Sequence, residues 1–354
     1  MTVTAKKSLC LALAAMLIVT CLVSCGEGLS RHSATEFELF DTVIELSGYT
    51  ESRERFDEVK NSLFDLLTEL HQDFDIYNTY GSTYLSNLAT VNGSVGMDYR
   101  SFVISRHLYE LLTFGREAHR ITNGKVNVAM GSVLSLWHGC RHAEAPGLPD
   151  AEALNEAAKH TDINMFYIAE TKAGFVLTVF DPLLTFDVGA IAKGYAAKKA
   201  VELLRSLCRE GESFLLNLGG MVCPVGSKPN GEPWQAGIEY PTSEPKDSYL
   251  RTIGISEGSL VTSAAHLRTF SVDGRSYGHI IDPSTLYPPE HFASVTVYSP
   301  DPAMGDLLST ALFCMTEEEG RALLAGLDRC EAMWVYPDMR VSTTENFGLN
   351  QILN

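Results

Sequence analysis

Residues 183–195 carry two side chains suited to binding a polar or anionic ligand, one on each side of a glycine turn. The apolar run Leu183–Phe186 predicts a short buried strand, and the residues from Ala190 to Leu204 predict a helix. A helix that starts after a glycine turn presents free backbone N–H groups, which can bind a phosphate. Asp187 could accept from a ligand hydroxyl or amine, and Lys193 could pair with a phosphate. An ordinary strand–helix turn, with Asp187 as the N-cap, would show the same pattern.

A second polar group follows Asp301-Pro302, which is a typical helix start with an aspartate cap and a proline in the first turn. Asp306, Ser309 and Thr310 then occupy positions i, i+3 and i+4, which share one helix face. One carboxylate and two hydroxyls are oxygen ligands suited to Mg²⁺, with phosphate and water completing the coordination. A solvated polar helix face is the alternative.

Two further motifs end predicted strands. Asn217–Gly220 closes a strand with two glycines, which indicates either a tight bend or a close approach to a ligand. Gly278–Ile281 predicts another strand, with His279 on it and Asp282 directly after it. His279 could act as a general base, although a structural role is common for a lone histidine.

Helices and strands alternate along the whole chain, and hairpins dominate the second half. This order predicts an α/β or α+β fold with few clean domain boundaries. Helices are expected at 53–72, 101–122, 130–137, 151–159, 302–315 and 317–327. A strand is expected at 37–49 and an exposed loop at 77–92; paired strands are expected at 166–186, and further strands at 214–225, 234–240, 250–256, 259–263, 269–272, 294–298 and 332–336.

The first residues have the pattern of a bacterial export signal. Lys6 and Lys7 precede an uncharged apolar run that is short for a membrane span, and Leu22-Val23-Ser24-Cys25 is typical of a lipobox. We therefore expect residues 1–24 to be a lipoprotein signal peptide, Cys25 to be lipidated, residues 25–32 to form a tether, and residues 33–354 to form a single domain. An uncleaved anchor helix, or a plain signal cut nearby, is the alternative.

The remaining chain is acidic. The sequence carries 27 Lys+Arg and 44 Asp+Glu, so without Lys6 and Lys7 the balance is 25 basic against 44 acidic residues. Such a surface repels nucleic acid and anionic lipid, so an anionic ligand would need a metal ion or a local basic cluster. Five cysteines follow Cys25 in a spacing that fits no zinc motif, and their odd number prevents complete internal pairing. They are Cys140, Cys208, Cys223, Cys314 and Cys330, of which Cys314 and Cys330 are expected to be buried free thiols.

Together these motifs, in this order, resemble the ApbE family of FAD:protein FMN transferases, over residues 37 to 340. The similar segments are FDVGAIAKGYA from Phe186, NLGG from Asn217, VTSA from Val261, HIIDP from His279 and GDLLSTALF from Gly305. This chain differs from the usual family pattern at Ala89, Asn127, Ala129, Met221, Ala264 and Leu286.

The resemblance implies an ApbE-like fold, with mixed helices and largely antiparallel sheets around one flavin-binding cleft. It implies that FAD is contacted by Phe40, Tyr77, Lys125, Val126, Asn127, Asp187, Lys193 and Ile280. It implies that Mg²⁺ is bound by the carbonyl of Ala190 and by Asp306, Ser309 and Thr310.

The reaction implied by the resemblance is transfer of FMN from FAD to a threonine or serine hydroxyl of an exported acceptor protein, with release of AMP. Mg²⁺ would neutralise the pyrophosphate, and His279 is the candidate base. Two other functions remain open: a metal-dependent FAD pyrophosphatase that gives FMN and AMP, and an FAD-binding lipoprotein without catalysis. We expect no nucleic-acid partner. We expect contact with a membrane through the lipid anchor.

The lipobox can be tested by replacing Cys25 with alanine. The Cys25→Ala protein is expected to lack acyl label and to leave the membrane fraction, because the thiol is the attachment point of the lipid. Acyl labelling and fractionation of parent and variant measure this. Unchanged labelling and an unchanged membrane fraction in the variant would refute the assignment.

Overall fold

The computed structural model describes residues 28–81, 85–97, 99–172, 174–242 and 249–348. Its largest sheet has eight strands in the order β1-β2-β6-β7-β10-β13-β14-β15, and the neighbouring strands with a recorded register are antiparallel. The strands are β1 (Ser30–Glu36), β2 (Ile44–Thr50), β6 (Ser213–Leu218), β7 (Met221–Val225), β10 (Ser259–Ala264), β13 (Ser294–Ser299), β14 (Glu331–Val335) and β15 (Val341–Thr343). Strand β1 includes Ser30, so the sheet begins inside the segment expected to be a tether.

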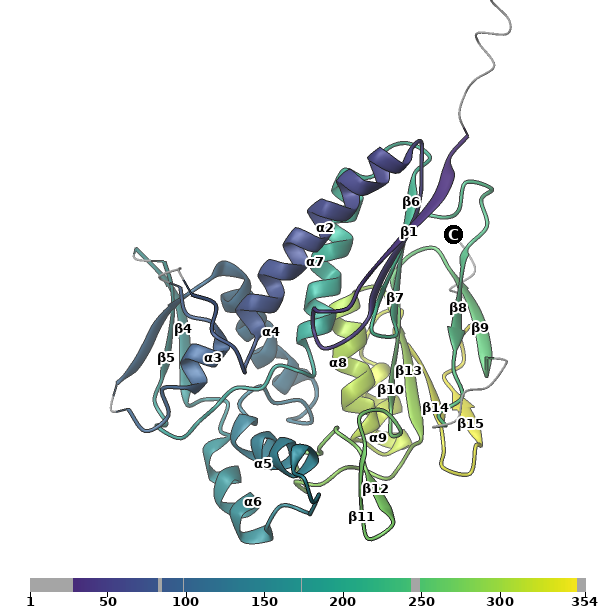
Figure 1. Ribbon diagram of the computed structural model, residues 1–354. Helices are drawn as coiled ribbons and strands as arrows, with labels where there is room; N and C mark the ends of the chain where they lie inside the picture. Colours follow the sequence, from purple (N-terminus) through teal and green to yellow (C-terminus); the bar gives the residue numbers. More distant parts are fainter. Residues whose placement is uncertain (1–27, 82–84, 98, 173, 243–248, 349–354) are drawn as a thin grey trace, which may run out of the picture.

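Helices cover one face of this sheet (Figure 1). They are α2 (Arg53–Phe74), α7 (Ala192–Leu207), α8 (Pro302–Phe313) and the shorter α9 (Glu317–Leu324). Helix α7 packs on both α2 and α8, and their apolar residues share one continuous core with the inner face of the sheet. On the opposite face, the hairpin of β8 (Trp234–Ile238) and β9 (Arg251–Ile255) packs over β10, β13 and β14 in a second, smaller core.

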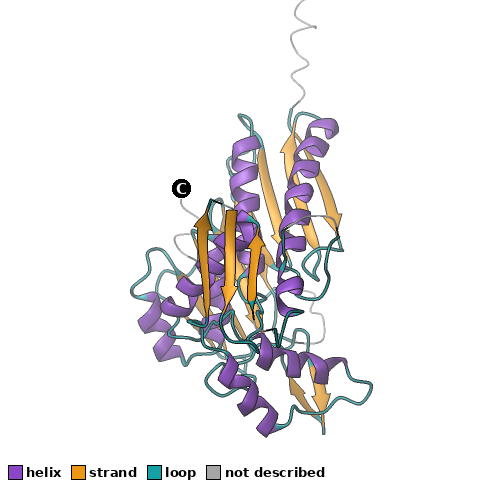
Figure 2. Ribbon diagram, turned by 90° about the vertical axis from the view of Figure 1, so that its left-hand side faces the viewer, coloured by secondary structure: helices purple, strands orange, loops and turns teal. Residues whose placement is uncertain are grey.

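Two smaller units flank the helices. A three-stranded antiparallel sheet, β3 (Arg100–Ile104), β5 (Gly174–Val179) and β4 (Phe166–Thr171), packs on α4 (Arg106–Ile121) and lies in front in Figure 2. The short helix α3 (Leu88–Asn92) lies near it. The second unit consists of α5 (Gly131–His142), α6 (Ala151–Ala157), the 3₁₀ turn η1 (Ala158–His160), and the hairpin β11 (Phe270–Val272) and β12 (Arg275–Tyr277) around the buried Trp137.

The α+β class with antiparallel sheets is confirmed, but several expected elements were wrong. Residues 101–122 are not one helix. Strand β3 comes first, and α4 starts only after Ser105, whose hydroxyl accepts the N–H of Leu108 and caps the helix. Residues 37–49 are not one strand, because the chain turns at Phe40 and Asp41, both with positive φ, before β2.

Three further expectations were wrong for local reasons. The loop expected at 77–92 ends in helix α3, capped by the side chain of Asn87. Gly278–Ile281 is not a strand, since β12 ends at Tyr277. Leu183–Phe186 is not a strand: Leu183 lies in a turn, and in the described chain no strand pairs with the buried Leu184 and Phe186. Polar side chains and the backbone of residues 128–131 bond to this segment instead, as described below.

The described part of the chain agrees with the expected state of the thiols. All five cysteines after Cys25 are free, and Cys223, Cys314 and Cys330 are buried. Cys25 itself lies outside the described residues. No helix among the described residues is long and apolar enough to cross a bilayer.

Candidate functional site

The candidate site is built around a contact between the start of α7 and the second turn of α8. The N–H of Gly194 donates to Asp306 Oδ2 at 2.7 Å, and Lys193 Nζ lies 3.6 Å from Asp306 Oδ1. Asp306 is only 4 % exposed. Burial raises the pKa of its carboxyl group, and Lys193 and the Gly194 N–H oppose that rise. Lys193 and one N–H only partly offset the burial of this charge, so a further cation would stabilise the ionised carboxylate.

Apart from Asp306, the expected metal ligands are neutral oxygens, which suit a hard cation. Gly194 is the third residue of α7, so its N–H has no acceptor within the helix and donates to Asp306 instead; the described chain shows no hydrogen bond from it to the Ala190 carbonyl. Thr310 lies one turn after Asp306 and is partly exposed. Among the described residues, no three His, Cys, Asp or Glu side chains form a metal cluster. A cation here would therefore depend on one carboxylate, neutral oxygens and the ligand's own phosphates, as Mg²⁺ sites often do.

Ser309 differs from the other expected metal ligands. Its side chain is fully buried. Its hydroxyl donates to the carbonyl of Asp306 at 3.0 Å and lies 2.9 Å from the hydroxyl of Ser263 on β10. Both contacts are internal, so Ser309 supports the turn that carries Asp306.

Asp187 lies at the other side of the turn before α7. Its Oδ1 accepts the N–H of Gly189 at 2.9 Å, and α7 has Ile191 as its N-cap with no side-chain cap bond. Asp187 is therefore not the helix cap. Its Oδ2 is 3.8 Å from Nε2 of His138, whose Nδ1 is 3.0 Å from the hydroxyl of the exposed Tyr77.

The sequence motifs did not single out His138. Burial lowers the pKa of its imidazole, and the nearby Asp187 opposes this shift. His138 lies on α5, in an apolar segment where nothing in the sequence marks it as a site residue. Only the fold brings it between Tyr77 and Asp187. The three side chains thus come together from three separate elements.

Two polar side chains that sequence reasoning also missed help to hold the segment leading to Asp187. The side-chain amide of Asn92, which is partly buried, accepts the N–H of Phe186 at 2.8 Å and donates to its carbonyl at 2.9 Å. Arg100 is 2 % exposed and donates to the carbonyls of Asp181 and Leu184 at 3.0 and 2.8 Å. The backbone also contributes, with the Gly131 N–H donating to the Thr185 carbonyl and the Asp187 N–H to the Val128 carbonyl, so the buried backbone groups of the segment have partners.

His279 is placed as an uncharged base. Its Nδ1 is 3.0 Å from the carbonyl of Leu267. Because a carbonyl only accepts, Nδ1 carries the proton and Nε2 keeps a free lone pair. Burial lowers the pKa of His279 to about 4, and the positive charges of Arg268 and Lys193 add to this shift. The imidazole is therefore neutral at neutral pH, and the charge of Lys193 helps to keep it so.

The remaining expected contact residues lie around this centre with most of their polar groups already bonded. Lys125 Nζ is 2.9 Å from Asp282 Oδ1, which ties the 125–127 segment to the residue after Ile281. The amide of Asn127 bonds the carbonyl of Thr161 and the N–H of Ala129, and Val126 is buried.

Phe40 and Ile280 are partly buried against the core. The N–H of Phe40 donates to His71 Nδ1 at 3.3 Å.

Two sequence patterns have structural explanations. The glycine pair of Asn217–Gly220 forms the β6–β7 turn with positive φ at both glycines, and a Cβ on Gly219 would lie 2.4 Å from the hydroxyl oxygen of Thr42. The glycine at position 219 is therefore explained by its close approach to Thr42 and not by a ligand. Leu286, where the family pattern has glycine, adopts φ 64°. This conformation strains a leucine, which explains the family's preference for glycine.

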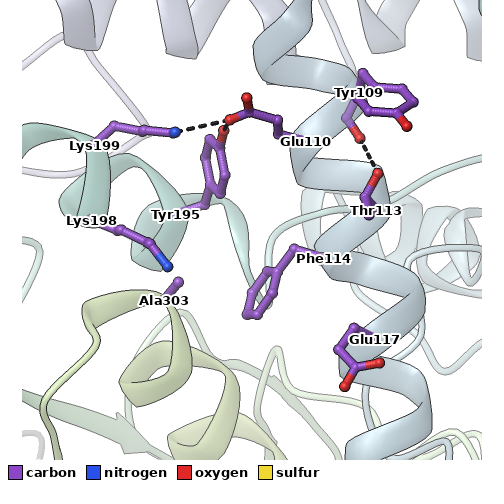
Figure 3. A pocket seen from close by; sticks show the side chains of 9 residues that line it. All are labelled: Tyr109, Glu110, Thr113, Phe114, Glu117, Tyr195, Lys198, Lys199 and Ala303. Carbon is purple, nitrogen blue, oxygen red and sulfur yellow. Dashed lines mark hydrogen bonds and ion pairs between the residues drawn. The ribbon is translucent and has the colours of Figure 1, made fainter. Parts of the chain in front are cut away.

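A separate cavity of about 370 Å³ lies between α4, α7 and the start of α8 (Figure 3). The hydroxyl of Tyr195 and Nζ of Lys199 both bind the carboxylate of Glu110, at 2.6 and 2.9 Å, and Lys198 pairs with Asp301 at 2.6 Å. The charged groups of Glu110, Lys198 and Lys199 in this cavity therefore already have partners within the protein. None of the expected site residues lines it, so we place the site at the Lys193–Asp306 pair.

The fold and this site define an α+β protein whose candidate site includes a lysine, a buried carboxylate and an uncharged histidine. The model of the ApbE family matches residues 40–334, and the chain belongs to this family.

Similar proteins include the FAD:protein FMN transferase of Treponema pallidum, 32% identical over 269 residues that cover 72% of each chain, and one from Klebsiella pneumoniae, 30% identical over 251 residues, 71% of this chain and 75% of the relative. The crystal structure of the ApbE protein of Thermotoga maritima superimposes with a TM-score of 0.78 at 24% identity, covering 91% of this chain and 99% of that one.

The close contact between α7 and α8 can be tested with two glycine substitutions. A Cβ on Gly194 would lie 2.4 Å from Asp306 Cβ and 2.9 Å from the carbonyl of Pro302, whereas one on Gly139, in the exposed part of α5, would meet nothing within 4 Å. Gly194→Ala should therefore lower the free energy of unfolding by roughly 1–3 kcal/mol. Gly139→Ala should raise it by about 0.5–1 kcal/mol, because alanine favours helix. Urea unfolding measures both, and equal stabilisation by the two substitutions would contradict the contact.

Proposed function

We propose that this protein transfers the FMN part of FAD to a threonine or serine hydroxyl of an exported acceptor protein and releases AMP. Family membership supports the proposal, as do relatives named FAD:protein FMN transferase that share most of their length with this chain. The observation that carries it is the pairing of Lys193 with the buried carboxylate of Asp306, together with the neutral imidazole of His279. Phosphoryl transfer requires positive charge at the phosphate and a base at the attacking hydroxyl.

We propose that Mg²⁺ binds at Asp306, with the carbonyl of Ala190 and the hydroxyl of Thr310. Ser309 would contribute less, because its hydroxyl is already bonded to Ser263 and to the carbonyl of Asp306. When bound, Mg²⁺ supplies charge neutralisation and polarises the phosphorus. The buried carboxylate supports this assignment, since a cation would offset its desolvation.

The reaction follows from the positions of the chain's own groups. Lys193 would hold the pyrophosphate through its ammonium group. The acceptor hydroxyl oxygen forms a bond to the FMN phosphorus, and the bond from that phosphorus to the bridging oxygen breaks, so that AMP leaves with the bridging oxygen. His279 Nε2 would take the hydroxyl proton, because its lone pair is free while Nδ1–H donates to Leu267.

The remaining family positions would hold the flavin and adenosine parts of FAD. Tyr77 is 70 % exposed and its hydroxyl contacts His138, so its ring can stack on a planar ligand. The Oδ2 of Asp187 can accept from a ligand N–H or O–H. Phe40 and Ile280 offer apolar contacts. The segment Lys125–Asn127 would act mainly through its backbone, because its side chains are bonded or buried within the protein.

The two alternatives use the same site differently. A pyrophosphatase would let water attack in place of the acceptor. A carrier would bind FAD without breaking it, and such a protein would gain nothing from a buried carboxylate beside the phosphates. Incubation with FAD and Mg²⁺, with and without acceptor protein, separates the three functions.

We also propose the location inferred from the sequence: an extracytoplasmic protein anchored by a lipid on Cys25, with one catalytic domain that includes β1 and therefore begins by Ser30 and not at residue 33. The acidic composition supports a small-molecule and protein partner and argues against nucleic acid.

The metal assignment can be tested with Asp306→Asn. This change removes the negative charge but keeps an oxygen that can accept the Gly194 N–H, so the fold should survive. AMP release from FAD is expected to fall at least a hundredfold at every Mg²⁺ concentration, while Ser309→Ala should lose activity only partly. The measurement is AMP release across a Mg²⁺ titration, with thermal melting as the folding control.

A matched control is Asp65→Ala, which removes an exposed carboxylate from α2. It should leave AMP release and its response to Mg²⁺ unchanged. Full activity of Asp306→Asn across the titration would show that the metal binds elsewhere.

A further inference from the structure

The C-terminal end of α2 carries three polar side chains that no motif assigned. They are His71 in the last turn of the helix, Asp75 at its C-cap, and Tyr80 in the loop that follows. The N–H of Asp75 donates to the carbonyl of His71 at 2.9 Å, so the helix end fixes the positions of these two residues. Hydrogen bonds join the group to two of the expected FAD contacts, Phe40 on one side and Tyr77 on the other.

The turn that carries Phe40 has a backbone conformation that needs support. Phe40 and Asp41 have φ values of 55° and 52°, in the left-handed region that residues other than glycine rarely adopt. Such conformations persist where the surrounding contacts hold them. Here the Phe40 N–H donates to His71 Nδ1 at 3.3 Å, and the two rings meet edge to face with their centres 5.5 Å apart. Arg268 holds the next residue, with its guanidinium donating to the Asp41 carbonyl and lying 3.2 Å from Oδ2.

Asp75 holds the loop that carries Tyr77. Its carboxylate accepts the N–H of Tyr77 at 2.7 Å, the N–H and side-chain amide of Asn78 at 3.1 and 3.0 Å, and the hydroxyl of Tyr80 at 2.6 Å. Asp75 is only 8 % exposed, and burial raises the pKa of its carboxyl group, but these hydrogen bonds outweigh burial and lower the pKa overall. Asp75 is therefore an ionised carboxylate that can only accept hydrogen bonds.

Tyr80 and His71 complete a continuous hydrogen-bond network between the two sides. The hydroxyl of Tyr80 donates to Asp75 and lies 3.3 Å from His71 Nε2. It keeps its proton at neutral pH, because burial and the bond to Asp75 raise the pKa of Tyr80 to about 12. Its oxygen can therefore only accept from His71, so Nε2 carries the proton and Nδ1 is left to accept the Phe40 N–H. Both ends of the network thus require the same neutral tautomer of His71.

We propose that His71, Tyr80 and Asp75 are positioning residues that hold Phe40 and Tyr77 in the arrangement that binds a planar ring of FAD. This inference rests on the proposed function, but it concerns residues outside the family motifs quoted above. The two aromatic side chains come from different segments of the chain, so a ligand that contacts both needs their relative position to be fixed. Because a preorganised site loses less conformational freedom on binding, breaking the network should weaken FAD binding and leave the chemical step unchanged.

The network can be broken at one atom with Tyr80→Phe, which keeps the ring and removes the hydroxyl between Asp75 and His71. Binding of FAD, riboflavin and AMP is measured by calorimetry in the parent, in Tyr80→Phe and in the matched control Tyr167→Phe, which removes the hydroxyl of an exposed tyrosine on β4. Tyr80→Phe should weaken FAD binding about threefold to tenfold, as the loss of a hydrogen bond does, and should raise KM for FAD equally with kcat unchanged. Tyr167→Phe should behave as the parent does.

Two substitutions at His71 separate positioning from packing. Asparagine can place its side-chain oxygen where Nδ1 lies, so His71→Asn keeps an acceptor for the Phe40 N–H, whereas His71→Leu keeps only an apolar side chain. His71→Asn should therefore bind FAD more tightly than His71→Leu. In the parent without FAD, nitrogen NMR of the histidine rings should show the proton of His71 on Nε2.

The results of these experiments distinguish the positioning role from the proposed function. Weaker binding of riboflavin but not of AMP identifies the ring as the flavin, and the reverse identifies it as the adenine. Unchanged FAD binding by Tyr80→Phe, equal binding by the two His71 variants, a His71 proton on Nδ1, or a lower kcat without weaker binding would each overturn the positioning role. Any of these results in a protein that still transfers FMN would leave the proposed function standing, whereas a parent that binds no FAD would contradict both.

Discussion

The arrangement of the site depends on one buried hydrogen bond, from the Gly194 N–H on α7 to the Asp306 carboxylate on α8. It brings the two helices together closely enough that only glycine fits at position 194. It also gives an acceptor to an N–H in the first turn of α7, where the helix itself supplies none. The same carboxylate lies 3.6 Å from the Lys193 ammonium, and the arrangement holds a charge out of water at a cost in free energy.

The approach to this contact is equally constrained. Residues 183–187 are not part of a sheet, and their backbone is bonded by the side chains of Asn92 and Arg100 and by the backbone of residues 128–131. A fully buried arginine bonded mainly to carbonyls is unusual; burial lowers the pKa of Arg100, and the charge of Asp181 opposes this shift. Its position suggests that it fixes the segment from which Asp187 reaches the site, and not merely that it fills the core.

The sequence predicted local features well and long-range ones poorly. Asp301-Pro302 marked the start of α8, and the i, i+3, i+4 spacing put Asp306, Ser309 and Thr310 on one turn. Local pattern could not show that Ser309 is turned inward to Ser263, or that Gly194 meets Asp306, 112 residues later in the chain. Strand β3 was taken for helix because its partner, β5, lies far along the chain. His138 was missed because no motif marks a histidine on an apolar helix.

The central claim is covalent transfer of FMN to another protein, and intact-mass analysis of an acceptor tests it most directly. Candidate exported proteins would be co-expressed with this protein, and the modified residue located by peptide mass spectrometry. The account predicts an addition equal to the mass of one FMN less one water on a threonine or serine, formed together with AMP. An acceptor of unchanged mass, with free FMN and AMP accumulating instead, would contradict the account and identify the protein as a pyrophosphatase.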